Sequence, residues 1–182
     1  MMPEAMWGQW SEYHIYKGGE RIGNILASRV VKGERAFYRM DSRSEFTLLW
    51  KQDVLTTMSA EYAMGRLIGC HSTVKVNGAV RDSSHMAHRS GILEGYIHKG
   101  RHLQLKDAHP WTTARLYFEE PVGVAAIFVE SELQDLPMTR IAEGVYKLTF
   151  TDRSENRYVY RNGVLEEIHV IRTFFDLLFK RT

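Results

Sequence analysis

The feature that most constrains the fold of this chain is a series of glycine-containing dipeptides at short intervals. They are Gly18-Gly19, Lys32-Gly33, Met64-Gly65, Asn77-Gly78, Lys99-Gly100, Glu143-Gly144 and Asn162-Gly163. Asn-Gly and Gly-Gly suit tight hairpins, because both central residues of a type I′ turn have positive φ. Apolar and polar residues alternate between these turns, which is the period of a strand with one buried face. The pattern predicts a meander of antiparallel hairpins.

The predicted strands are long. The clearest alternation runs from residue 36 to residue 46, where Tyr38 and Met40 point to one face and Arg39 to the other. The next run predicts one apolar face made of Trp50, Val54, Met58, Ala60 and Tyr62. Strands of about ten residues exceed the usual five or six and tend to coil. We therefore expect an all-β domain whose antiparallel sheet curls into a barrel or half-barrel, with bends at Gly23 and Gly69.

One segment departs from the alternation. Trp111, Ala114, Arg115 and Phe118 follow i, i+3, i+4, i+7 spacing, and a proline stands at position 121. This spacing predicts a short helix over residues 111–118. The helix could plug one end of the sheet or lie in its concave face. The last apolar run, residues 164–179, is either one long strand or two strands joined by a bend.

Length and composition favour a single folded domain. The chain has 182 residues, 44% of them hydrophobic, and a formal net charge of +2. We expect an N-terminal extension over residues 1–9 and one β-barrel-like domain over residues 10–182. The net charge is too small to favour nucleic-acid binding, and no apolar run approaches the roughly 20 residues of a membrane-spanning helix. The first ten residues lack the pattern of a signal peptide, so we expect a cytoplasmic protein or a mature form whose leader was removed.

A search for metal or nucleophile chemistry finds little. Among eight histidines, His85 and His88 point to opposite faces of a predicted strand, and a third ligand beside His98 and His102 is lacking. The spacing of His98 and His102 around a turn predicts that they are cross-strand neighbours. Cys70 lies on an apolar face, which favours a buried, inert thiol. We therefore expect no metal and no cofactor.

Catalytic motifs are also absent. The chain contains neither a Gly-x-Ser-x-Gly elbow nor a phosphate-binding glycine motif. Glu119 and Glu120 follow the predicted helix, where one of them could act as an acid or base together with a histidine. A solvated helix end is the plainer interpretation of the pair. We expect no enzyme, with a small enzyme using Glu119 or Glu120 as the least favoured alternative.

Aromatic residues are spread over most of the predicted strands. They can form an ordinary core, but a curled sheet lined with aromatic and methionine side chains is also a common wall for an apolar ligand. The candidate ligand-binding residues are Tyr38, Trp50, Met58, Trp111, Tyr117 and Phe118. An enclosed apolar pocket of ~300 Å3 or more would favour a binding protein. A core packed to normal density would favour a structural or protein-interaction module.

Three phrases resemble a bacterial family of unknown function. Residues 13–23, Tyr-His-Ile-Tyr-Lys-Gly-Gly-Glu-Arg-Ile-Gly, resemble its Tyr-x-Val…Gly-x-x-Ile-Gly start. Residues 114–121, Ala-Arg-Leu-Tyr-Phe-Glu-Glu-Pro, are similar to its central helix and Leu-Tyr-Phe-Glu-Glu-Pro phrase, and residues 158–165 to its closing hairpin. The resemblance implies a coiled antiparallel sheet and export to the periplasm or cell envelope, because members are short envelope proteins made with a signal peptide. It implies no activity, cofactor or catalytic residue, and the present chain departs from it in lacking the leader.

The favoured hypothesis is therefore a non-enzymatic binding or carrier protein that holds a lipid or other apolar small molecule in the concavity of the sheet. The alternative is an interaction module whose interior is filled and which is recognised through an edge strand or a surface patch.

Overall fold

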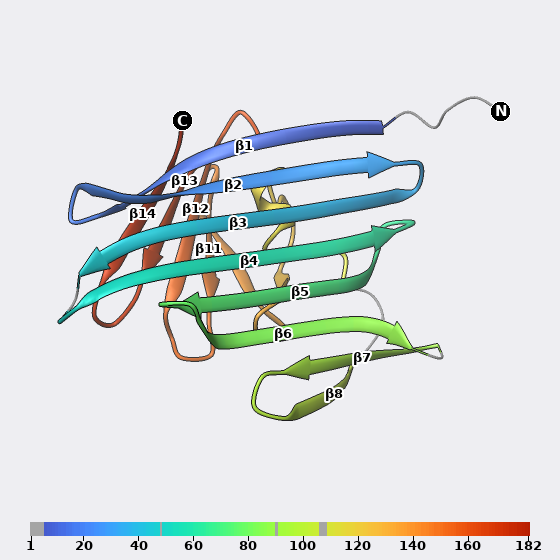
Figure 1. Cartoon of the computed structure of the whole chain (residues 1–182). Coiled ribbons are helices and arrows are strands. Elements are labelled where there is room, and N and C mark those ends of the chain that lie inside the picture. Colours follow the sequence, from blue (N-terminus) through green and yellow to red (C-terminus); the bar gives the residue numbers. More distant parts are fainter. Residues whose placement is uncertain (1–5, 48, 90, 106–108) are drawn as a thin grey trace.

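The computed structural model describes residues 6–47, 49–89, 91–105 and 109–182. In this part of the chain, fourteen strands form one antiparallel sheet (Figure 1). The N-terminal half contributes β1 (Met6–Lys17), β2 (Glu20–Lys32), β3 (Arg35–Thr47), β4 (Lys51–Ala63), β5 (Arg66–Val76), β6 (Ala79–Arg89), β7 (Ile92–Ile97) and β8 (Arg101–Leu105). The C-terminal half contributes a short 3-10 helix, η1 (Arg115–Tyr117), then β9 (Ala126–Val129), β10 (Gln134–Ala142), β11 (Val145–Thr149), β12 (Glu155–Arg161), β13 (Val164–Ile171) and β14 (Asp176–Arg181).

The two halves join where β1 pairs with β14, Tyr13–Tyr16 lying opposite Arg181–Leu178. All other neighbours in the sheet are consecutive in the chain, so the sheet runs from β8 through β1 and β14 to β9. In Figure 1, β1–β6 run across the view and β11–β14 run steeply behind them. The edge strands β8 and β9 are not paired with each other in the described residues. The predicted antiparallel meander is confirmed, and its curl is a half-barrel that stays open.

The turns form where the glycine dipeptides predict them. Met64, Asn77 and Asn162 have φ of 50°, 51° and 52°, and Lys99 has φ of 79°. The glycine that follows each of them also has positive φ. Two consecutive residues of positive φ are what tight hairpins between long twisted strands require. The dipeptides therefore set the strand length and the order of the meander.

The predicted bends coincide with β-bulges. The register between β1 and β2 shifts so that Ile22 is unpaired beside Gly23, and between β4 and β5 it shifts so that Ile68 is unpaired beside Gly69. A side chain at position 23 would collide with the carbonyl oxygen of Arg43 and with the backbone of Ser44. Glycine there lets β2 and β3 approach closely while the bulge increases the local twist.

The helix is shorter than predicted. Only Arg115–Tyr117 are helical, and they form a single 3-10 turn. The residues before this turn are held by β9, because Thr112 forms a parallel bridge with Phe128 and the backbone N–H of Phe128 donates to the carbonyl of Trp111 at 2.9 Å. Backbone groups that are hydrogen-bonded to a strand cannot also begin an α-helix. The helical spacing in the sequence therefore starts at residue 111, whereas the helix itself starts at Arg115.

Two element boundaries differ from or refine the predictions. β1 already begins at Met6, so the strand includes four residues of the expected N-terminal extension, while residues 1–5 lie outside the described part. The last apolar run forms two strands, β13 and β14, joined at residues 172–175, which is the second of the two predicted alternatives.

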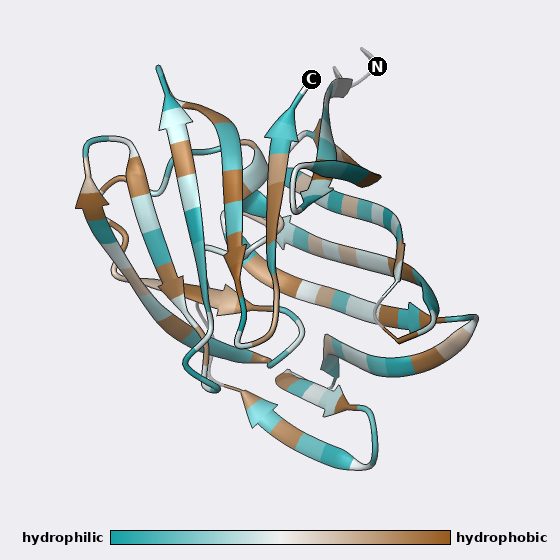
Figure 2. Ribbon diagram, turned by 90° about the vertical axis from the view of Figure 1, so that its left-hand side faces the viewer, coloured by the Kyte–Doolittle hydropathy of each residue, from teal (hydrophilic) through white to brown (hydrophobic). Residues whose placement is uncertain are grey.

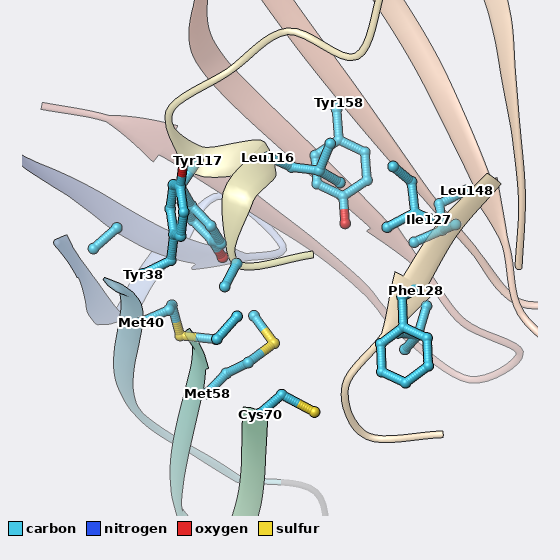
Figure 3. Packing of buried hydrophobic residues seen from close by; sticks show 14 of the residues in the cluster. Tyr38, Met40, Met58, Cys70, Leu116, Tyr117, Ile127, Phe128, Leu148 and Tyr158 are labelled. Carbon is cyan, nitrogen blue, oxygen red and sulfur yellow. The ribbon is translucent and has the colours of Figure 1, made fainter. Parts of the chain in front are cut away.

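The buried side chains lie on the inner face of the curl. Figure 2 shows hydrophobic and hydrophilic bands alternating along the strands. Met40, Met58 and Cys70 come from the neighbouring strands β3, β4 and β5 and point into the space between the two halves (Figure 3). Leu116 and Tyr117 of η1 and Tyr158 of β12 lie across from them. The core is therefore shared by the two walls and by the segment between β8 and β9.

Candidate ligand cavity in the half-barrel

We call residues 109–120 the plug, because this segment fills one end of the concavity between the two walls. Its main anchor is Glu130, which follows β9 and is fully buried. The Glu130 carboxylate accepts hydrogen bonds from the backbone N–H of Thr113 at 3.1 Å and of Ala114 at 2.9 Å, and also from the Thr113 hydroxyl. Ser84 of β6 donates to the Glu130 carbonyl at 2.5 Å. Burial raises the pKa of Glu130, although these hydrogen bonds oppose the rise.

Glu119 ties the plug to the N-terminal wall. Tyr38 of β3 donates to one Glu119 oxygen at 2.6 Å, and Arg115 donates to the other at 2.6 Å and 3.0 Å. Arg29 of β2 lies 3.6 Å from the first oxygen. Burial by itself would raise the pKa of Glu119, but the hydrogen bonds from Arg115 and Tyr38 and the charge of Arg29 lower it overall. Burial, together with the bond to Glu119, raises the pKa of Tyr38 to about 12.

Glu120 ties the plug to the C-terminal wall, where it accepts a hydrogen bond from Tyr146 of β11 at 2.8 Å. Nearby, Tyr160 of β12 donates to the carbonyl of Leu116 at 2.6 Å. Neither Glu119 nor Glu120 contacts a histidine in the described part of the chain. The glutamate–histidine pair that an enzyme would need is therefore not formed there, and the interpretation of the two glutamates as a solvated helix end is wrong.

Beside the plug, the concavity contains a cavity of about 240 Å3. Its N-terminal wall is lined mainly by Ile25, Met40, Ser42, Thr56, Met58, Ser72 and Val74. Its C-terminal wall is lined mainly by Phe150, Asn156, Tyr158, Ile168, Arg172 and Phe179, while Thr113 and Tyr117 of the plug close one end. The volume is below the ~300 Å3 expected of a binding protein, and the cavity is partly open to solvent instead of enclosed. At roughly 30 Å3 for each water-sized group, about eight such groups fill it.

On β3 and β4, the inner side chains beside the cavity are smaller than those beside the plug. In β3 the inner face carries Tyr38 beside the plug and Ser42 beside the cavity. In β4, which pairs antiparallel to β3, Tyr62 lies at the level of the plug and Thr56 at the level of the cavity. Large residues fill the curl at one end, and small residues leave it hollow at the other. This change in size is visible in the sequence and could have located the cavity.

Arg172 is the charged residue in the lining that sequence reasoning missed. It follows Ile168 and Val170 at alternate positions and so continues the inner face just beyond β13. Its Nη1 donates to the Asn156 Oδ1 at 3.0 Å, and its guanidinium lies 5.0 Å from the centre of the Phe150 ring. Burial lowers the pKa of Arg172. An arginine at the end of an otherwise apolar strand face was the signal.

The structure distributes the predicted ligand-binding residues over several places. Met58 and Tyr117 line the cavity. Tyr38 is buried against the plug, with its ring 6.0 Å from that of Phe118. Trp111 is half-buried under the Arg115 guanidinium, 4.3 Å from the ring centre.

The expectation that Trp50 shares the inner face with Met58 is wrong. Trp50 is 64% exposed, because Thr47 pairs with Lys51 and so leaves Trp50 in the loop between β3 and β4. Strand β4, whose alternation predicted the apolar face, begins one residue after Trp50, at Lys51.

A larger hollow of about 560 Å3 lies on the outer face of β13 and β14, under the Gly18-Gly19 turn. It is lined by Tyr16, Ile171, Leu178, Lys180 and His169, which point away from the core. His169 and Lys180 are both engaged by Glu167, at 3.1 Å and 3.9 Å. This hollow is walled by only one layer of the sheet and faces solvent, whereas the interior cavity is walled by both halves and the plug.

The histidines and the cysteine give no metal site in the described residues, where no three ligand groups gather. The prediction that His98 and His102 are cross-strand neighbours is wrong, because His102 lies opposite Tyr96. Cys70 is buried as predicted, and burial raises the pKa of its thiol well above the usual value. No helix in the part of the chain described here is long and apolar enough to cross a membrane.

The fold and the cavity define a β-barrel-like protein with an open half-barrel and a small internal hollow. Residues 13–182 match the family described as "Domain of unknown function (DUF6134)", and the chain belongs to this family. A solved structure described as a beta-barrel-like protein of domain of unknown function DUF1849, from Brucella abortus, superposes with a TM-score of 0.58 at 11% identity, covering 95% of both chains. This likeness shows a shared fold. The comparison with curated proteins found no match.

Proposed function

We propose that this protein is a non-enzymatic binding or carrier protein that holds a small apolar ligand in the interior cavity. The observation that carries the proposal is the 240 Å3 hollow between two walls of a sheet whose other end is filled by the plug. An interaction module with a filled core would have no reason to keep such a hollow, since interiors normally pack to the density of organic crystals. Its lining is mostly apolar with a few polar groups, which is the usual composition of a ligand site.

The size of the cavity limits the ligand. Space for roughly eight water-sized groups accepts one short acyl chain or one aromatic ring system, and not a phospholipid with two long chains. The plug favours binding because its hydrogen bonds to both walls hold the cavity open before a ligand arrives, which reduces the ordering cost of binding. We assign Glu119 and Glu120 this holding role and no catalytic one.

We further propose that the protein works in the periplasm or cell envelope. This part of the proposal rests on the likeness of its phrases at residues 13–23 and 114–121 to envelope proteins. Fractionation of the native host with an antibody to this protein tests it, and recovery in the cytoplasmic fraction alone would contradict it.

The test of ligand binding uses the neutral fluorescent probe 1-naphthylamine, a single fused ring system, and two variants of β5. Ser72 lines the cavity, and Thr73 is on the other face of the same strand. We expect saturable fluorescence with the unmodified protein and with Thr73→Leu, and at least tenfold weaker binding with Ser72→Leu, whose longer side chain extends into the hollow. Equal affinity in all three proteins would show that the probe binds elsewhere and would contradict the proposal. Native mass spectrometry of protein purified from its own host would then identify a co-purifying ligand.

A further inference from the structure

Arg172 places a positive charge in a largely apolar cavity. It lies where the inner faces of β12 and β13 end, with Phe150 and Phe179 also in the lining. Its side chain is half-buried, so it is partly removed from water. A buried charge costs free energy unless it is paired and hydrogen-bonded.

One side of the Arg172 guanidinium is fixed by the protein. Nη1 donates to the carbonyls of Glu155 at 3.1 Å and Ile171 at 3.0 Å, besides the Asn156 Oδ1. The ring of Phe150 lies 5.0 Å from the guanidinium and restricts its position. These contacts hold the fork in one orientation within the lining of the cavity.

The other side of the guanidinium has no protein partner among the described residues. Within the described residues, neither Nε nor Nη2 makes a hydrogen bond, and no carboxylate there forms an ion pair with Arg172. Asp152 stabilises its charge from a distance, but the Asp152 carboxylate accepts from the backbone N–H of Ser154 at 2.9 Å. Nε and Nη2 are the two groups with which an arginine binds both oxygens of a carboxylate or phosphate.

We infer that the cavity binds an amphiphilic anion, whose carboxylate pairs with Arg172 while its single short acyl chain lies between the two walls. This inference rests on the proposed function, since it names the ligand class of the same cavity. The anion would add a direct ion pair to the guanidinium, which Asp152 stabilises only from a distance. The chain would extend from Arg172 along the small side chains of Ser42, Thr56 and Ser72 toward Tyr117. The hollow sets its length at about eight groups.

Competition against 1-naphthylamine tests the inference with two ligands of equal chain length, octanoate and 1-octanol. We expect octanoate to bind the unmodified protein at least tenfold more tightly than 1-octanol, because a charge-assisted pair adds to equal apolar burial. Arg172→Met should abolish this preference by weakening octanoate and leaving 1-octanol within about twofold. Arg172→Lys should keep part of the preference. The matched control is Arg161→Met, since Arg161 is exposed at the far end of the same pair of strands.

The outcomes separate the inference from the proposed function. If both ligands bind with similar affinity to the unmodified protein, the carrier function stands and the anion inference is overturned. If neither binds, and 1-naphthylamine does not bind, the proposed function fails. Inorganic phosphate and acetate are further competitors. If either of them displaces the probe as effectively as octanoate does, the site binds free anions and the inference of an amphiphilic ligand is overturned. The comparison of ligands on the unmodified protein decides the matter even if Arg172→Met does not fold.

Discussion

The two ends of this half-barrel use the same sheet and the same hairpins, yet one end is filled and the other is hollow. At the filled end, the plug is bonded to both walls through Tyr38, Tyr146 and Tyr160, at 2.6–2.8 Å. At the hollow end, the N-terminal wall presents Ser42 and Thr56, and the space remains. The curvature of the sheet therefore does not decide whether its interior is full. The size of the inner side chains and the path of one connecting segment decide it.

Removal of Glu130, the buried anchor of the filled end, should cause the largest loss of stability. Glu130→Ala leaves the backbone N–H groups of Thr113 and Ala114 buried without an acceptor. We expect the free energy of unfolding to fall by about 3 kcal/mol or more. Urea denaturation at neutral pH measures it. Glu132→Ala is the control, since the Glu132 carboxylate bonds only exposed partners, and a loss under about 1 kcal/mol for Glu130→Ala would contradict the anchoring role.

The same enlargement should have opposite consequences at the two ends. Ala114 is buried in the plug, so Ala114→Leu overpacks it and should cost about 1–3 kcal/mol of stability. Ser72→Leu extends into the cavity and should change the free energy of unfolding by less than about 1 kcal/mol. Thermal and urea unfolding of the two variants side by side measure the difference. Equal destabilisation would mean that the two ends are equally filled.

Acid should weaken the link between the plug and the N-terminal wall. The folded-state pKa of Glu119 is lowered, so its carboxylate stabilises the fold fully above the unfolded pKa, near 4.5, and this stabilisation disappears as the pH falls through the folded pKa. Glu119→Gln should cost about 1–2 kcal/mol at pH 7. The difference in the free energy of unfolding between the variant and the unmodified protein should then disappear below pH 4.5.

Urea unfolding of both proteins between pH 7 and pH 3 tests this dependence on pH. Glu130 has a raised pKa and so favours the fold less as the pH rises, but it is present in both proteins and cancels in their difference. If the difference in the free energy of unfolding stays constant down to pH 3, the charge of Glu119 contributes nothing to stability.

The smallest effect is expected at the rim of the hollow end. Trp50→Ser removes an exposed side chain and should change the free energy of unfolding by less than about 0.5 kcal/mol. The affinity for 1-naphthylamine should stay within twofold. A fivefold loss of affinity would place Trp50 against the bound ligand and extend the site into the loop between β3 and β4.

Much of the fold could be predicted from local sequence because its turns are local. A dipeptide such as Asn77-Gly78 needs no distant partner to adopt two positive φ angles, and Ile22-Gly23 needs only its neighbouring strands to form a bulge. The helix was overpredicted because its period is local, while the bridge between Thr112 and Phe128 is not. Trp50 was misplaced because one residue of error at a strand end changes a buried position into an exposed loop.

The site was less predictable, because it depends on which residues meet across the curl. Met58 and Tyr117 were named as apolar wall residues and both line the cavity. Glu130 and Arg172 were not named, since neither stands in a motif and each gains its role only from distant segments. Glu130 needs Thr113 and Ala114 brought to it by the path of the plug.

By itself, the sequence determined an antiparallel meander of long strands, its turns, its bends and the face that β3 and β4 bury. These properties follow from backbone sterics and from a side-chain period of two, which act within a few residues. The tertiary structure alone decided that β1 pairs with β14, that β8 and β9 remain unpaired, and that the plug fills one end only. Contacts between residues far apart in the chain form these features, and the hollow they leave beside Arg172 is where we expect the ligand to bind.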